Sequence, residues 1–310
     1  MISVIRDVTI GVSDLDKASR FFRQALGYHE TDRGRVEDKE WLCAWRVPAG
    51  VAADYAILAP EGARDGRLRL LACSEPGERI WGDYGRRQDL GHFAVNFRVP
   101  EIQVGWQRLL EAGAEPRSEP TYWMVNDEIS AWDSQCFGPD GVLLDVFEIE
   151  GAIVERLGEQ VTAASEVQTV AIHVSDMARS QALYEALGFK LLYDQVVENL
   201  EEFFHIPPGT RLHNVNLFKP GQTPNGRIEL VEYRGWKGSP VGERAAPPNH
   251  GILGISLATD DLETTGRSIE ERGAVRVTGP VILYQNAFGI DRLATFVGPD
   301  GEFLELYEPN

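Results

Sequence analysis

The stretch "FGPDGVLLDVFE" (137–148) occurs almost a second time as "VGPDGEFLELYE" (297–308). Each copy begins with a Gly-Pro-Asp-Gly turn and continues as a strand-like segment that carries an acid, Asp145 in one copy and Glu305 in the other. These two acids lie 160 residues apart in a chain of 310 residues. A repeat at this distance indicates two related halves, and the length alone predicts about two domains.

The same offset relates two predicted helices. The segments "VSDLDKASRFFRQALGY" (12–28) and "VSDMARSQALYEALGF" (174–189) both begin with Ser-Asp, whose side-chain oxygens cap the first free N–H groups of a helix. Both have apolar residues at helical spacing, and both end in a glycine, Gly27 or Gly188, as a left-handed C-cap prefers. Strand-like residues precede each helix, and three further strands follow it, so one unit reads strand, helix, three strands.

Each half contains a second unit of the same kind. The tetrapeptides "EAGA" (111–114) and "ERGA" (271–274) close the helices of these second units, again 160 residues apart. Asp65-Gly66 and Asn225-Gly226 predict tight turns before the last strand of the first and third units. The sequence therefore predicts four units joined by connections at 76–87, 151–165 and 235–249; the units are 1–75, 88–150, 166–234 and 248–310.

With these repeats the chain resembles the vicinal oxygen chelate superfamily, which includes glyoxalase I, bleomycin-resistance proteins and type I extradiol dioxygenases. The resemblance covers nearly the whole chain and implies an α+β fold of four βαβββ units paired into two cup-like domains. The expected domains are 1–150 and 166–310, each formed by two successive units, because the connection between the halves is short. Pairing of the units across the halves stays open as the alternative.

The resemblance also implies ligand positions on the first and last strand of each unit, where the family usually carries His or Gln and Glu. Thr and Ile are not credible replacements for an imidazole, and an arginine has no lone pair to give a metal. In order along the chain, the residues expected at these positions are Asp7, Arg69, His92, Asp145, Thr169, Glu229, Ile252 and Glu305, with His250 two residues before Ile252.

Two interpretations of the first half remain open. In one, Asp7, His92 and Asp145 form a metal or catalytic site and Arg69 holds an anionic substrate group. In the other, Arg69 pairs with Asp145 or Asp7 inside a former ligand site.

Two further arrangements remain open as well. The second half offers Glu229, Glu305 and His250 as alternative metal ligands. Pairing across the halves would instead gather His92, Asp145, Glu229 and Thr169.

Aromatic residues supply candidate pocket walls in the first half. Trp41 and Trp45 alternate on a segment that we interpret as a strand, and Arg46 follows them as a candidate rim residue. Flat aromatic walls suit a ring-shaped ligand, although core packing explains tryptophans equally well.

Composition and charge argue against several classes of partner. A formal net charge of −18 argues against nucleic acid and against an anionic membrane surface. Three widely spaced cysteines, together with a start that lacks the pattern of a signal peptide, favour the cytoplasm. No nucleotide-binding loop is found.

We therefore expect a protein that acts on a small aromatic or carbonyl-bearing molecule by stabilising an oxyanion. The candidate activities are those of a dioxygenase, a lyase or an isomerase. A non-catalytic binding protein of the resistance type is the alternative. A divalent metal (Fe, Mn, Zn or Ni) and a metal-free site are both compatible with these residues, and exposed sheet edges are compatible with a homodimer.

Overall fold

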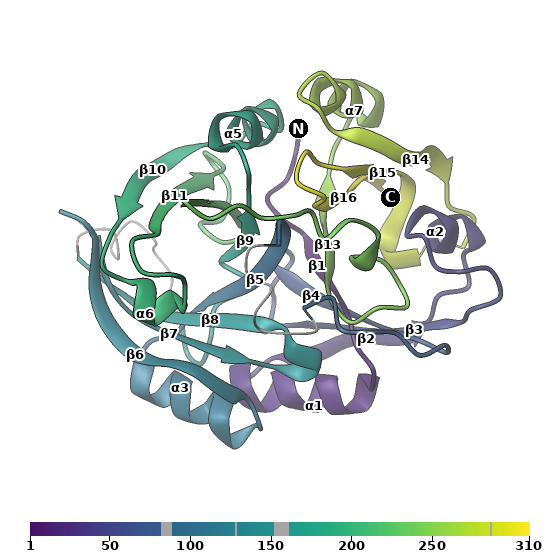
Figure 1. Cartoon of the computed structure of the whole chain (residues 1–310). Helices are drawn as coiled ribbons and strands as arrows, with labels where there is room; N and C mark the ends of the chain where they lie inside the picture. Colours follow the sequence, from purple (N-terminus) through teal and green to yellow (C-terminus); the bar gives the residue numbers. More distant parts are fainter. Residues whose placement is uncertain (82–88, 128, 152–160, 286) are drawn as a thin grey trace.

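Two curled eight-stranded sheets lie side by side, with two pairs of helices at opposite ends of the molecule (Figure 1). The computed structural model describes residues 1–81, 89–127, 129–151, 161–285 and 287–310. Much of the two predicted connections at 76–87 and 151–165 lies outside these residues.

The strands follow the four predicted units. Those of the first half are β1 (Asp7–Gly11), β2 (His29–Arg35), β3 (Ala53–Ala59), β4 (Arg67–Cys73), β5 (Gly91–Arg98), β6 (Glu115–Asn126), β7 (Ile129–Phe137) and β8 (Leu143–Glu150). Those of the second half are β9 (Thr169–His173), β10 (Lys190–Val197), β11 (Arg211–Phe218), β12 (Arg227–Arg234), β13 (Gly251–Ala258), β14 (Val275–Ile282), β15 (Ile290–Val297) and β16 (Phe303–Pro309). The helices are α1 (Leu15–Leu26), α2 (Lys39–Ala44), α3 (Ile102–Glu111), α5 (Met177–Ala186), α6 (Glu201–Phe204) and α7 (Leu262–Glu270).

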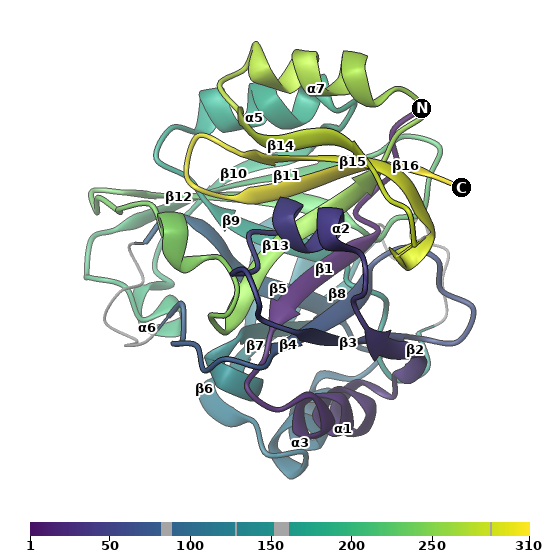
Figure 2. The same ribbon diagram turned by 90° about the vertical axis from the view of Figure 1, so that its right-hand side faces the viewer.

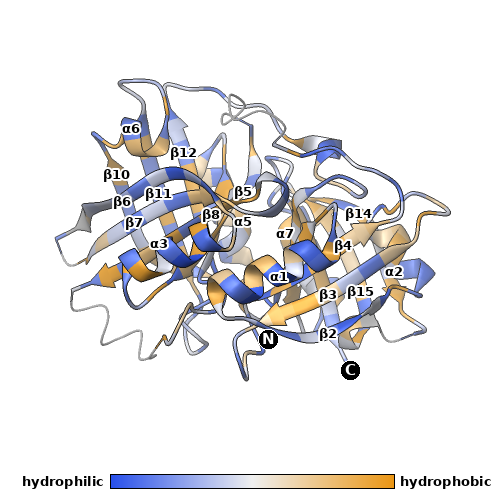
Figure 3. Cartoon of the chain, turned by 90° about the horizontal axis from the view of Figure 1, so that it is seen from below, coloured by the Kyte–Doolittle hydropathy of each residue, from blue (hydrophilic) through white to orange (hydrophobic). Residues whose placement is uncertain are grey.

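The predicted helix signals are confirmed. The Asp14 side chain accepts a hydrogen bond from the backbone N–H of Lys17, and Asp176 does the same for Arg179. Gly27 ends α1 in the left-handed conformation at φ 71°, which a residue with a Cβ adopts only at a cost. Figure 3 shows hydrophobic and hydrophilic residues interspersed along α1, and its buried residues include Ala18, Phe22 and Leu26.

The pairing of units differs from the preferred prediction. One sheet has the order β14-β15-β16-β13-β1-β4-β3-β2, and the other has the order β10-β11-β12-β9-β5-β8-β7-β6. The first unit therefore pairs with the fourth, and the second pairs with the third. The expectation that successive units share a cup is wrong, whereas the alternative of pairing across the halves is confirmed.

The short connection between the halves joins β8 to β9, and both strands belong to the sheet of units two and three, so this connection is compatible with pairing across the halves. Successive units meet through their helices, α1 beside α3 and α5 beside α7, while their strands complete different sheets (Figure 1). The chain passes from one sheet to the other between β4 and β5 and again between β12 and β13. The ranges 1–150 and 166–310 mark the repeat in the sequence, but each half contributes two units to two different sheets.

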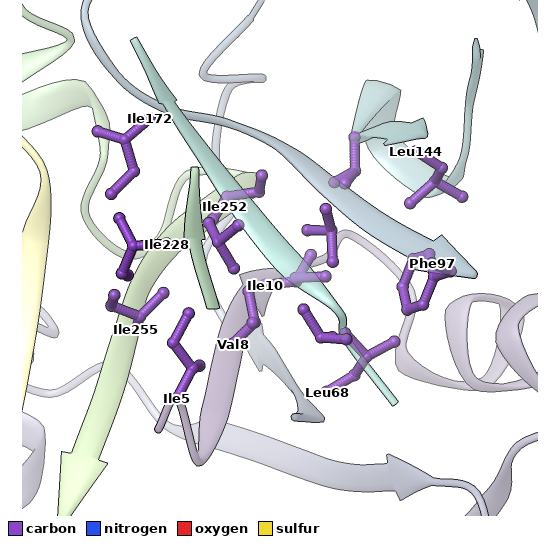
Figure 4. Close-up of a cluster of buried hydrophobic side chains, with 14 of the residues drawn as sticks. Ile5, Val8, Ile10, Leu68, Phe97, Leu144, Ile172, Ile228, Ile252 and Ile255 are labelled. Atoms are coloured by element: carbon purple, nitrogen blue, oxygen red, sulfur yellow. The ribbon is translucent and has the colours of Figure 1, made fainter. Parts of the chain in front are cut away.

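A single apolar core fills the space between the sheets. Every second residue of the central strands points into it, and Figure 4 shows the contributors from both halves. The labelled side chains are Ile5, Val8, Ile10, Leu68, Phe97, Leu144, Ile172, Ile228, Ile252 and Ile255. The alternate residues of the same strands point to the concave faces, which are the two cups.

Bulges in the central strands shift this alternation. The register of β5 against β9 slips between His92 and Ala94, and the register of β13 against β1 slips between Ile252 and Gly254. An extra residue in a strand turns the residues before it to the opposite face. His92 therefore pairs with Ile172 of the core, and Ile252, its counterpart in the fourth unit, lies in the core cluster.

Candidate functional site

Corresponding rows of side chains cross the two cups. In the sheet of units two and three, register pairs connect Gln135, Asp145, Asn96, Thr169 and Arg227 in sequence across β7, β8, β5, β9 and β12. In the sheet of units one and four, the corresponding row is Thr295, Glu305, Ser256, Asp7 and Arg67. In the second cup Arg69 fills the centre of the row, and a pocket of about 310 Å³ opens beside Arg67 along β2 and β3. In the first cup the cavity lies at the row itself. We call the second the filled cup and the first the open cup.

Arg69 occupies the centre of the filled cup. Its guanidinium donates to Asp7 Oδ2 at 2.9 Å and to Glu305 Oε1 at 3.2 Å, and none of it is exposed. Arg67 adds a two-pronged pair to Asp7, with distances of 2.7 and 3.1 Å. Both arginines hold the pKa of Asp7 below its usual value, although burial alone would raise that pKa. The geometry therefore has the form of the second interpretation, with Arg69 paired to Asp7 rather than facing a ligand.

Two tryptophans cover the charged centre of the filled cup. Trp41 and Trp45 belong to helix α2 and its C-cap, not to a strand, and they stack with their ring centroids 5.2 Å apart. The Trp45 Nε1–H donates to Glu305, and the Arg69 guanidinium lies over both indole rings. Figure 2 shows α2 placed over the concave face of this sheet. Arg46 follows α2 and donates to the carbonyl of Ala245 at 3.2 Å.

The open cup contains a cavity of about 70 Å³. Strands β7 and β8 contribute both the acids Asp133 and Asp145 and apolar side chains to its lining. The lining residues are Asn96, Trp123, Ile129, Ala131, Asp133, Asp145, Phe147, Ile149, Thr169, Leu192, Tyr193, Asn216, Arg227 and Glu229. A concave site with an apolar wall and a few converging polar groups has the character of a small-molecule site.

Asp133 and Asp145 form a carboxyl pair in this cavity. Burial raises the pKa of Asp133 well above its ordinary value, and the charge of Asp145 raises it further. Burial also raises the pKa of Asp145, although hydrogen bonds from Asp133 and Gln135 oppose this effect. Two adjacent carboxyls in low dielectric retain one proton between them. The pair therefore offers a protonated acid and a carboxylate at one place, and Trp123 Nε1 donates to Asp133 at 3.2 Å.

Glu229 is the third acid of the open cup. The side-chain amides of Asn96 and Asn214 donate to its two oxygens, each at 2.5 Å, and Thr169 donates at 3.3 Å. Burial raises the pKa of Glu229, while the hydrogen bond from Asn214 and the charge of Arg227 act in the opposite direction. Both oxygens of Glu229 are thus already occupied by donors from the protein.

Arg227 supplies the cation of the open cup. Its side chain is 5% exposed, and its Nε has no hydrogen-bond partner. Among the residues that the structure describes, no carboxylate forms an ion pair with it. Thr169 stands beside Arg227 where Asp7 stands beside Arg67, so the neutral threonine leaves this guanidinium without a partner.

The structure does not bring the predicted first-half cluster together. Asp7 lies in the filled cup and Asp145 in the open cup. His92 lies between the sheets, where its Nε2 is 3.1 Å from the carbonyl oxygen of Phe303. The physical reason is the bulge before Ala94, since a regular strand would have placed His92 on the same face as Asn96.

The predicted second-half cluster is separated in the same way. Glu229 belongs to the open cup and Glu305 to the filled cup. His250 lies outside both cups, with its Nδ1 4.0 Å from Asp140. Pairing across the halves does unite Asp145, Glu229 and Thr169, as the alternative arrangement predicted, but without His92.

Several residues of the open cup escaped the sequence analysis. They are Asn96, Asp133, Gln135, Asn214, Asn216 and Arg227. Alternation along β7 could have indicated Asp133 and Gln135, because each lies an even number of residues from Ala131. No signal of this kind could have found Asn96, since its face depends on the bulge.

The repeats and the fold agree with the comparison to known proteins. A family model, described as the Glyoxalase/Bleomycin resistance protein/Dioxygenase superfamily, matches residues 4–146 and again 166–306. The chain belongs to this superfamily. Among curated proteins none matches it.

Solved structures of the superfamily show the same fold. Glyoxalase I from Zea mays is 16% identical over 99% of this chain and 92% of that chain, with a TM-score of 0.64. A putative dioxygenase from Bacillus subtilis is 13% identical over 99% of this chain and 86% of that chain, with a TM-score of 0.58. At these identities the likeness concerns the fold alone. No helix in the described part of the chain is long and apolar enough to cross a membrane.

The open cup does not fit the divalent metal that superfamily membership suggests. No histidine lines its cavity. Asp133 and Asp145 are engaged with each other, and both oxygens of Glu229 accept amide N–H groups. Across the described ranges, no group of three or more His, Cys, Asp or Glu side chains is arranged to hold a metal. The donors present serve proton transfer and hydrogen bonding, and no step below passes through a metal.

Proposed function

We propose that the open cup is the active site of an enzyme that moves a proton on a small carbonyl-bearing molecule, as an isomerase or a lyase does. The observation that carries this proposal is the Asp133–Asp145 pair in the lining of a cavity, where burial raises the pKa of both carboxyls. An acid and a base at one place are what proton transfer beside a carbonyl requires.

The chemistry follows from the protonation of the pair. The Asp145 carboxylate takes a proton from the carbon next to the carbonyl, and the electrons of that C–H bond form a C=C bond. The carbonyl π electrons move to the oxygen, which takes the proton from Asp133 and becomes an enol. Where the carbon that lost the proton carries a hydroxyl, this enol is an enediol. Asp145 then returns its proton to the former carbonyl carbon while Asp133 takes the proton of the other hydroxyl, so a C=O bond forms at the neighbouring carbon and the isomer results with no net change in electrons. The amide side chains of Asn96 and Asn216 line the same cavity; the Asn96 amide donates one N–H to Glu229, and a side-chain amide has a second N–H that could hold the oxygen.

Deuterium incorporation tests this proposal across a panel of candidate substrates. Small ketones, aldehydes and 2-oxo acids are incubated with the protein in D₂O, and NMR follows the loss of the signal from the carbon next to the carbonyl. We expect protein-dependent exchange in at least one compound and a loss of at least about 100-fold in Asp145→Asn. Glu305→Gln, which changes the corresponding acid of the filled cup, should retain the rate.

Two results would contradict the proposal. One is exchange that survives in both Asp133→Asn and Asp145→Asn. The other is stoichiometric Fe, Mn, Zn or Ni in protein purified without a tag, lost in Asp145→Asn together with the exchange, because a metal would then supply the chemistry. The three free cysteines are compatible with the cytoplasm as the place of action.

A second candidate is a non-catalytic protein that binds a small molecule in the same cup. It is favoured by the loss of the superfamily's usual ligand residues, because Asn96 and Thr169 stand on the first strands where the family usually carries His or Gln. Ligand binding in the open cup with no deuterium exchange in any compound would support this candidate over the enzyme.

A further inference from the structure

Arg67 and Arg227 are the last residues of the two rows, and each pairs with the corresponding residue of the neighbouring strand, but their surroundings differ. Arg67 pairs with Asp7 in the ladder between β4 and β1, and Arg227 pairs with Thr169 in the ladder between β12 and β9. The backbone therefore presents both side chains to their cups in the same way. The charge of the neighbouring residue is what differs between them.

The filled cup shows what such an arginine holds when an anion is present. Arg67 donates from Nε and from one terminal nitrogen to the two oxygens of Asp7, a two-pronged arrangement that suits a planar carboxylate. In the open cup the corresponding donor Nε of Arg227 is buried and has no partner. A buried cation without an anion is costly, so an arrangement of this kind indicates a ligand that supplies the charge.

We propose that Arg227 binds the carboxylate of a small organic acid, which takes the place at Arg227 that Asp7 takes at Arg67. This inference names the ligand class of the open cup and rests on the proposed function only in assuming that this cup binds a small molecule. Two features favour a monocarboxylate over a phosphate. The partner found at Arg67 is itself a carboxylate, and a doubly charged group would lie close to Glu229.

The row geometry places the rest of the ligand. Asp145 and Arg227 lie three strands apart in one row, or roughly 14 Å between their backbones on a flat sheet and less across a curled one. A molecule whose carboxylate contacts Arg227 therefore extends toward the Asp133–Asp145 pair. The apolar side chains of Phe147 and Ile149 continue from Asp145 along β8 and line the same cavity, which suits an apolar or aromatic body.

Net charge does not exclude an anion from this cavity. Asp133 and Asp145 share a proton, and the carboxylate of Glu229 is neutralised in part by three donors. Arg227 is thus the unpaired charge of the cavity wall. Among the described lining residues, no second guanidinium or ammonium is available to hold a carboxylate.

Binding measurements with matched neutral probes test the inference. Acetate, pyruvate and benzoate are titrated against the protein by calorimetry, each beside its neutral amide. We expect at least one carboxylate to bind at least tenfold more tightly than its amide, and Arg227→Gln to abolish this preference while leaving the affinity for the amide unchanged. Arg67→Gln is the control, because it removes the arginine at the same row position of the filled cup, which is partly exposed, and it should keep the preference.

A conservative variant and a direct signal keep the test decisive if Arg227→Gln does not fold. Arg227→Lys retains the charge but not the two-pronged geometry and should keep only part of the preference. The Nε–H resonance of Arg227, assigned by its absence in Arg227→Lys, should shift on titration with the carboxylate and not with the amide. A preference that persists in Arg227→Gln, a preference that is lost equally in Arg67→Gln, or no preference in the unchanged protein would overturn the inference.

These outcomes are separate from those of the proposed function, because they are measured without turnover. If carboxylate binding depends on Arg227 but the protein exchanges no deuterium, the carboxylate ligand is supported and the proposed enzymatic function is contradicted. If the protein exchanges deuterium into a neutral ketone and Arg227→Gln does not change the rate, the enzymatic function is supported and the carboxylate ligand is contradicted.

Discussion

At the scale of single residues, two corresponding positions distinguish the cups. Asp7 forms ion pairs with Arg67 and Arg69 in the filled cup, whereas Thr169 leaves Arg227 without an ion pair in the open one. The residue two positions after the row arginine also differs: it is Arg69 after Arg67 in β4 and Glu229 after Arg227 in β12. The repeat thus retains its backbone, while individual side chains decide whether the charged groups of a cup pair with one another or leave an arginine without an ion pair.

Buried His92 leads to a prediction at the same scale. Burial lowers the pKa of His92 to about 4, because its charged form loses hydration, although the hydrogen bond with Phe303 opposes this shift. The unfolded chain binds this proton below pH about 6.5, so unfolding takes up a proton between these values and stability falls as the pH falls from about 6.5 to about 4. The histidine should contribute about 3 kcal/mol to that loss.

His92→Gln should remove this part of the pH dependence while retaining a donor for the Phe303 carbonyl. Urea unfolding between pH 4 and pH 7 measures the free energy of unfolding in the variant and in the unchanged protein. His29 is exposed and provides the control His29→Gln, which should leave the slope of the unfolding free energy against pH unchanged. Identical slopes in all three proteins would show that His92 is not held neutral in the folded state.

At the scale of elements, the short helices α2 and α6 occupy corresponding positions in units one and three, and they lie over different cups. Each ends in a residue of left-handed conformation, Arg46 at φ 58° and His205 at φ 50°. The residue before it is Trp45 in one cup and Phe204 in the other. Trp45 donates to Glu305, whereas Phe204 packs in an apolar cluster and has no side-chain donor to reach Asp145. The indole N–H therefore helps α2 to close the filled cup.

Matched substitutions in α2 test this role. Trp41 and Trp45 are both almost completely buried and stack on each other, but the Nε1 of Trp41 has no partner. Trp41→Phe should cost only packing, whereas Trp45→Phe should also remove a hydrogen bond to a buried carboxylate. We expect Trp45→Phe to be the more destabilising by about 1.5–3 kcal/mol, measured by urea unfolding. Equal costs would mean that the indole N–H does not stabilise the closed cup.

Elements also show how far the sequence could predict the site. Helix starts at Asp14 and Asp176 and the helix end at Gly27 were predictable because a cap is a local interaction. The face of a strand residue was predictable only where the strand is regular. His92 was misplaced because a bulge depends on the partner strand, β9, which lies in the other half of the chain. Asp145 and Glu229 lie on the concave face, as expected for their last strands, because these strands have no such irregularity before them. The preferred pairing had assigned them to different cups, and only the alternative pairing across the halves united them.

At the scale of the whole molecule, the two halves complete each other. The ladders β1–β13 and β5–β9 each join a strand of one half to a strand of the other. Turn residues add to these contacts, since the backbone N–H of Gly66 donates to Ile5 while its carbonyl accepts from Val167 of the second half. Gly66 lies at φ 62°, and a Cβ there would come within 2.9 Å of the Val167 carbonyl oxygen, so the close approach of the halves requires glycine. The offset of 160 residues predicted four units, but it could not reveal their pairing, because all four have similar strand edges.

Dividing the chain tests this shared architecture. Fragments 1–151 and 152–310 each contain two complete units, but each lacks the strands that pair with its central strands in both sheets. We expect the coexpressed fragments to purify together as a one-to-one complex close to the 34.5 kDa of the intact chain, because the exposed edges of β1 and β5 require β13 and β9. Each fragment alone should aggregate or pair with its own copies. Two fragments that separately give monomers with cooperative unfolding would instead show that each half forms its own cups, and the open cup would then lose either Asp145 or Arg227 from its row.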